Sequence, residues 1–186
     1  MKKDVKSFLD IVIRYSVLVA MGFFSFKVFY FLFSSSTVYS VFFSLKLFFE
    51  TSMLYDVIFV RNILIEIIGP CVAGSAYYLL LILNLSIPGI KLGKRLGILL
   101  FSFLSFFIIN VLRIFFLSIL LVYGVSFFDI THKLFWYIGS SVFVVGIWFL
   151  GVKLFRIKEI PFYSDIKFLL KNSGKKTKKA KHSKKH

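Results

Sequence analysis

The sequence predicts an all-α integral membrane protein, a multi-pass bundle of four or more transmembrane helices followed by a disordered basic C-terminal tail. Three observations support this fold class. The 186-residue chain is 59% hydrophobic and 20% aromatic, its mean hydropathy is +0.88, and several apolar runs are long enough to cross a bilayer. One membrane domain, residues 1–155, therefore takes most of the chain, and residues 156–186 form a cytoplasmic juxtamembrane segment and tail.

Four apolar runs have the length of a transmembrane helix. Three of them are bounded by glycine, proline or charged residues, and they cover residues 71–87, 96–123 and 132–155. The fourth, residues 13–33, qualifies despite Lys27, whose long side chain can carry its ammonium to a polar environment. No small-residue cleavage pattern follows this fourth run, so we expect a retained anchor rather than a cleaved signal peptide.

Two further segments have no single interpretation. Residues 37–54 are rich in aromatic side chains and carry Lys46 and Glu50 at helical i,i+4 spacing. They suit an interfacial helix or a short buried helix with an internal ion pair. Residues 57–68 suit an outer segment or part of an extra hairpin. Either choice leaves the later runs with the same orientation.

Positive charge predicts that orientation. The formal net charge is +16, with eight lysines in residues 171–186, a basic loop at residues 91–95 and a basic N-terminus. Lysine and arginine accumulate on the cytoplasmic side, so all three segments are expected inside the cell. A basic tail can also bind nucleic-acid phosphates. Beside a transmembrane run, however, the topogenic role is favoured, so the bilayer and not nucleic acid is the expected partner.

Cys71 is the only cysteine, which excludes an intramolecular disulfide and a dithiol redox pair. It follows Pro70 at a predicted helix start, where backbone N–H groups and the helix dipole favour a thiolate nucleophile. The alternative is a small residue buried in a membrane helix. Ser75 comes one turn later and is expected on the same face, where it either supports a site or packs against a neighbouring helix.

Arg113 lies 17 residues after Leu96, which at about 1.5 Å per residue brings it close to the outer face. A guanidinium within a span costs about 2.5–3.5 kcal/mol on insertion scales and is usually retained for a partner or a function. It could stabilise a thiolate or an oxyanion, or hold a substrate carboxylate. The alternatives are a structural ion pair or a side chain that extends to the outer headgroups. Asn110, one turn earlier, could orient Arg113 by a hydrogen bond or join two helices.

His132 is the only histidine outside the tail, and its imidazole can accept a thiol proton and return it to a leaving amine. A Cys–His pair is the minimum apparatus for acyl transfer through a thioester. The alternative is a histidine at the headgroup level. Glu66 and Asp129 could orient the imidazole, although their spacing gives no signal. No metal or cofactor is expected, since His182 and His186 alone make a poor site.

These residues form three motifs in a fixed order. They are Pro70-Cys71-Val72-Ala73-Gly74-Ser75, Asn110-Val111-Leu112-Arg113-Ile114 and the lone His132. Over residues 67–155 the chain thereby resembles the exosortase/archaeosortase family of multi-pass membrane proteins. The first motif differs from the Cys-Ser/Thr-Gly string of many members, because two residues separate Cys71 from Gly74.

The resemblance implies a membrane cysteine protease or transpeptidase. Its substrates would be membrane-anchored exported proteins with a C-terminal sorting signal, which consists of a short motif, a hydrophobic helix and a basic end. Carried over by motif, Cys71 would attack a peptide carbonyl at the outer face, His132 would act as acid and base, and Arg113 would stabilise the intermediate. The acyl-enzyme would then pass to an acceptor or to water.

Two other classes are compatible with the sequence. A non-enzymatic assembly subunit or a small transporter would pair Arg113 with a buried acid such as Glu50, and Cys71 would be dispensable. A transporter is also expected to carry repeats or interrupted helices, which the sequence does not suggest. A protein that tethers nucleic acid would instead depend on residues 171–186.

Overall fold

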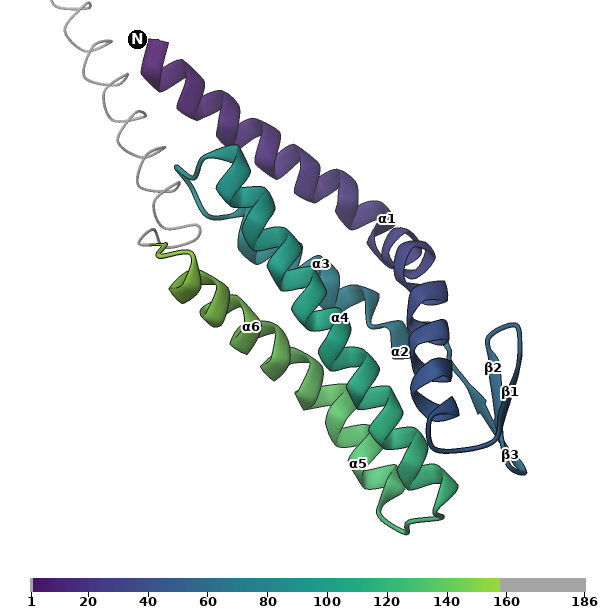
Figure 1. The fold of residues 1–186 in the computed structure, drawn as a ribbon. Helices are drawn as coiled ribbons and strands as arrows, with labels where there is room; N and C mark the ends of the chain where they lie inside the picture. Colours follow the sequence, from purple (N-terminus) through teal and green to yellow (C-terminus); the bar gives the residue numbers. More distant parts are fainter. Residues whose placement is uncertain (1, 158–186) are drawn as a thin grey trace, which may run out of the picture.

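The computed structural model of the protein describes residues 2–157 and is mostly helical (Figure 1). Four long helices form a bundle, and three short helical segments connect or extend them. The helical segments are α1 (Lys2–Lys46), α2 (Gly69–Val72), α3 (Gly74–Leu85), α4 (Leu92–Val122), α5 (Phe128–Leu134), the π-helical turn η1 (Phe135–Gly139) and α6 (Ser140–Leu154). Of the predicted tail, only residues 156 and 157 fall within the described residues.

The two ends of the bundle differ in character (Figure 1). The start of α1, the α3–α4 connection and the end of α6 lie together, and this end includes Lys91, Lys94 and Arg95. We refer to it as the basic end. The end of α1, the end of α4, helix α5 and a small β-sheet lie at the opposite end, the sheet end.

The apolar runs correspond to helices, with two differences. Helix α4 covers almost the whole of the run 96–123, and α1 contains the run 13–33. The run 132–155 forms α5, η1 and α6 in succession, so the helical segment begins four residues before His132. The run 71–87 is not one helix, because Ala73 adopts a left-handed conformation (φ 56°) that separates α2 from α3.

The prediction of an all-α chain is wrong for residues 51–66. They form a three-stranded antiparallel sheet in the order β1 (Thr51–Leu54), β2 (Val57–Val60), β3 (Ile63–Glu66). Two-residue turns join the strands, and Tyr55 and Arg61 have the positive φ that tight hairpin turns require. The turns lack the Asn-Gly or Asp-Gly pairs that reveal a hairpin in a sequence. Because α1 ends at Lys46, Lys46 and Glu50 do not share a helix.

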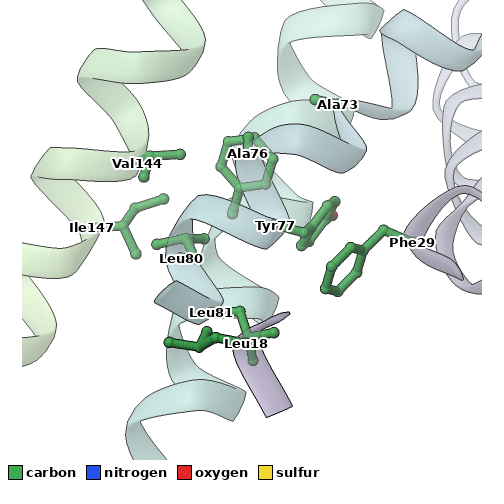
Figure 2. Packing of buried hydrophobic residues seen from close by; sticks show 10 residues of the cluster. Leu18, Phe29, Ala73, Ala76, Tyr77, Leu80, Leu81, Val144 and Ile147 are labelled. Carbon is green, nitrogen blue, oxygen red and sulfur yellow. The ribbon is translucent and has the colours of Figure 1, made fainter. Parts of the chain in front are cut away.

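Two apolar cores hold these elements together. The first lies between the long helices around Tyr77, with Phe29 beside it (Figure 2). The Tyr77 ring stacks on Phe33, with centroids 4.1 Å apart. The second fills the space between the sheet, the end of α1 and the middle of α4. Ala73 belongs to the first core and Cys71 packs against the second. Helix α2 therefore lies where the two cores meet.

The polarity of α4 is inverted relative to that of a helix in water. Its outward face is apolar at every fourth position, and each of these side chains is more than half exposed: Leu92, Leu96, Leu100, Leu104, Ile108, Leu112 and Phe116. Its buried face carries the polar residues Arg95, Ser102, Asn110, Arg113 and Ser118. Helix α4 and the Lys27–Lys46 part of α1 are long and apolar enough to cross a membrane.

Two buried arginines close the end of α3. Arg14 and Arg95 each donate from Nη1 to the Leu85 carbonyl at 3.0 Å, and Nη2 of Arg95 donates to the Ile87 carbonyl at 3.1 Å. The last carbonyls of a helix lack intrahelical partners, so cationic donors are favoured there. Arg95 therefore stabilises the α3–α4 connection, besides the topogenic role predicted for the basic loop.

Substitution of Arg95 by alanine should lower the melting temperature of the purified protein in detergent. The change removes two charge-assisted hydrogen bonds, each worth about 1.5–3 kcal/mol. Lys94→Ala is the matched control, because Lys94 is the exposed neighbour of Arg95. Thermal unfolding followed by circular dichroism measures both variants, and equal melting temperatures would contradict the role assigned to Arg95.

Candidate active site

Cys71 lies in α2, a single helical turn between the sheet and α3. Pro70 occupies the first turn, where its missing N–H leaves no intrahelical bond unmade. The Cys71 N–H donates to the Ile68 carbonyl at 2.8 Å, and the residue is half-buried. The prediction that Cys71 opens a long helix is wrong, because Ala73 ends α2 after one turn. The dipole of so short a helix gives a thiolate little support.

Arg113 connects three elements. It projects from α4 and is 9% exposed. Its Nη1 donates to the Ser140 hydroxyl oxygen at 2.9 Å, at the start of α6, and its Nη2 donates to the Cys71 carbonyl at 3.3 Å, in α2. Both acceptors are neutral oxygens, and Glu50, the acid proposed as an ion-pair partner, is exposed. The guanidinium therefore joins α2, α4 and α6 through polar contacts, not through the ion pair that was considered as an alternative.

Asn110 joins two helices, which is one of the two roles considered for it. Its side chain is 2% exposed, and Nδ2 donates to the Cys71 carbonyl at 2.9 Å. Asn110 does not orient Arg113 by a direct hydrogen bond; both residues donate to this one carbonyl oxygen. Two donors from α4 thereby fix the backbone of the residue that carries the thiol.

Cys71, Arg113 and His132 line the same two adjoining cavities. The smaller, of about 40 Å³, is completed by Ile68, Pro70, Leu117 and Phe135. The larger, of about 200 Å³, extends along β3 and also contacts α5 and the end of α4. The three residues predicted from sequence thus come from three different helices and meet at one place.

His132 lies in α5, beside Phe128. The two rings stack almost in parallel, with centroids 5.7 Å apart and planes 4° apart. Glu66 lines the larger cavity together with His132, whereas Asp129 is exposed and is not among the lining residues. Of the two acids considered as orienting groups, only Glu66 therefore lies at the site.

Ser75 lies outside this cavity. It is exposed and lines a separate cavity of about 450 Å³ between α3 and α6. The prediction that Ser75 shares a face with Cys71 assumed a continuous helix, and the left-handed Ala73 between them removes that relation. Ser75 is therefore not a supporting residue of the Cys71 cavity.

Ser140 was not predicted, although it is one of the two acceptors of Arg113. Its hydroxyl accepts from Arg113 and approaches the Phe135 carbonyl at 3.5 Å, across the π-helical turn. Such turns often occur at functional sites. The only signal in the sequence is the run of small residues Gly139-Ser140-Ser141, which is equally typical of close helix packing.

This arrangement supplies the groups that acyl transfer requires. A thiol, a guanidinium and an imidazole line the same small cavity. The Nε atom of Arg113 is buried and has no hydrogen-bond partner, so one donor of the guanidinium is unused. Within residues 2–157, no cluster of three histidine, cysteine, aspartate or glutamate side chains could hold a metal ion.

Asn110→Ala should destabilise the protein, and Ser75→Ala should leave its melting temperature unchanged. The first change removes a buried donor from the Cys71 carbonyl, a loss of about 1–3 kcal/mol. The second removes an exposed hydroxyl, and such surface changes typically have little effect. The melting temperatures of the two variants are measured in the same detergent. An equal decrease in both would mean that Ser75 belongs to the same polar network as Asn110.

Comparison with known proteins provides no relative from which a function could be transferred. No family model matches the chain, and no curated protein or solved structure matches it. The likeness to the exosortase/archaeosortase family therefore rests on the three sequence motifs alone.

Proposed function

We propose that the protein is a multi-pass membrane cysteine peptidase or transpeptidase that cleaves C-terminal sorting signals of exported proteins. One observation carries this proposal: the only cysteine, a buried arginine and the only histidine outside the tail line one cavity, although they lie far apart in the sequence. The family resemblance, which uses the same three residues, independently points to the same chemistry.

The exposed apolar face of α4 supports a location within the bilayer. From Leu92 to Phe116 this stripe spans 24 residues, or about 36 Å at 1.5 Å per residue, which exceeds the ~30 Å hydrocarbon core. Soluble monomers rarely expose an apolar surface of this extent. The polar groups of α4 point inward, as intramembrane polar residues generally do.

The two ends of the bundle support the orientation. An open sheet edge does not occur in hydrocarbon, because its backbone groups would lack hydrogen-bond partners, so the sheet end belongs in water. The opposite end carries the basic loop and the N-terminus, which favour the cytoplasm. The cavity of Cys71 is next to the sheet and would therefore face the outside of the cell.

The proposed reaction proceeds through a thioester. His132 takes the proton of the Cys71 thiol, and the thiolate attacks the peptide carbonyl carbon. The resulting oxyanion is stabilised by Arg113, whose Nε–H has no other partner. The carbon–nitrogen bond then breaks, and His132 donates a proton to the leaving amine. An acceptor amine or water attacks the thioester, His132 takes its proton, and the Cys71 thiolate is released.

The first test is the processing of a co-expressed membrane-anchored reporter that ends in a short motif, a hydrophobic helix and a basic segment. Cys71→Ala should abolish cleavage, because no nucleophile remains. His132→Ala should slow it by about 10²–10⁴-fold, the usual contribution of a general acid–base. Arg113→Lys retains the charge but loses the two-pronged geometry, and it should also reduce cleavage.

Abundance in the membrane must be matched between these variants, and Ser75→Ala serves as the active control. Cleavage by Cys71→Ala at the wild-type rate would disprove the cysteine mechanism. It would favour instead a non-enzymatic assembly subunit or a small transporter, in which Cys71 is dispensable.

The orientation has a separate test that uses the single cysteine. A membrane-impermeant maleimide added to intact cells should modify Cys71, because its cavity opens towards the sheet end. A variant with Cys71→Ala and Lys94→Cys places the only thiol at the basic end, where the same reagent should react only after permeabilisation. The reverse pattern would show that the sheet end faces the cytoplasm.

A further inference from the structure

We propose that β3 binds the substrate as an added strand, so that an extended peptide lies along Leu64–Glu66 and presents its carbonyl to Cys71. This inference deepens the proposed function by assigning the mode of substrate binding. It is carried by the open edge of the sheet and by the position of that edge along the larger cavity.

The register shows which backbone groups of β3 are free. The Ile67 N–H donates to the Asp56 carbonyl at 3.1 Å, so these two residues form a hydrogen-bonded pair. Such pairs alternate along an antiparallel ladder, so Ile65 and Ile63 also bond towards β2. The N–H and C=O groups of Leu64 and Glu66 therefore point to the open edge. Within residues 2–157, neither has a backbone hydrogen bond to any segment outside the sheet.

This edge has only part of the usual protection of an open strand. β3 is short and Glu66 is charged, but Leu64 is exposed and the strand contains no proline, no lysine and no bulge. A free edge is a template for another strand, which binds through its own backbone groups.

The free edge continues directly into the candidate active site. Residues 64–68 line the larger cavity together with Cys71, Arg113 and His132. The volume of this cavity, about 200 Å³, is below the ~300–1,000 Å³ of typical small-molecule pockets. Its walls are mostly apolar. It therefore suits one apolar side chain of a peptide held by its backbone, next to the bond that is cleaved.

The test uses peptide probes that react with Cys71 on the full-length protein. An acetylated apolar tripeptide chloromethyl ketone is compared with the same peptide N-methylated at every amide. In both cases the thiolate displaces chloride and forms a thioether. Chloromethyl ketones also alkylate imidazoles, and His132 lines the same cavity, so mass spectrometry of a digest locates the label and Cys71→Ala is the control. The unmethylated peptide should react about tenfold faster, as expected for two additional net hydrogen bonds.

Leu64→Pro should slow the reaction of the unmethylated peptide several-fold. Proline lacks the outward N–H that would donate to a peptide carbonyl, and edge strands tolerate it where no ladder bond is lost. Leu64→Ala is the matched control, because it shortens the side chain and retains the N–H, so the rate of the unmethylated peptide should be retained. Glu66→Pro removes the other outward N–H and provides a second variant if Leu64→Pro does not fold, as judged by circular dichroism.

Equal rates for the two peptides on the wild type, or a wild-type rate for the unmethylated peptide in a folded proline variant, would overturn the proposal. So would a reaction of Cys71 with chloroacetamide but with neither peptide. A β3-dependent dimer, lost in Leu64→Pro with no change in the rates of the peptides, would mean that a second copy of the chain occupies the edge. A preference that persists while the reporter is never cleaved would support strand binding and count against the peptidase.

Discussion

The arrangement of the helices depends on the buried guanidinium of Arg113. A buried cation is costly unless its donors are paired, and here the partners are the carbonyl of Cys71 and the hydroxyl of Ser140. Because these oxygens belong to α2 and α6, the contacts that satisfy the charge also hold three elements of the bundle in place. The same hydrogen bonds that offset the cost of burying the Arg113 charge therefore also position the thiol.

The break at Ala73 is what makes this possible. A left-handed conformation costs an alanine about 1–2 kcal/mol, so the surrounding packing must compensate. It separates α2 from α3 at the junction of the two cores, which turns the Cys71 carbonyl towards α4 instead of into a helical ladder. A continuous helix would have used that carbonyl internally and left Asn110 and Arg113 without their shared acceptor.

The sheet end and the helical bundle suit different solvents. The bundle exposes apolar side chains on α4 and keeps its polar groups inside, as expected for lipid, whereas the sheet has an open edge that requires water or a partner. The candidate site lies next to the boundary between these two regions. A substrate whose anchor crosses the bilayer and whose motif emerges from it would present an extended segment at that level.

Composition and hydropathy alone predicted a mostly helical chain. Cys71, Arg113 and His132 could be identified because the only thiol, a guanidinium within the run 96–123 and the only imidazole outside the tail are conspicuous in an apolar sequence. The sheet escaped prediction because its turns use positive φ at Tyr55 and Arg61 without glycine or asparagine there. Ser75 was misplaced and Ser140 missed for a common reason. Periodicity describes neighbours along one unbroken helix, whereas the backbone break and the contacts between helices are decided only when the chain packs.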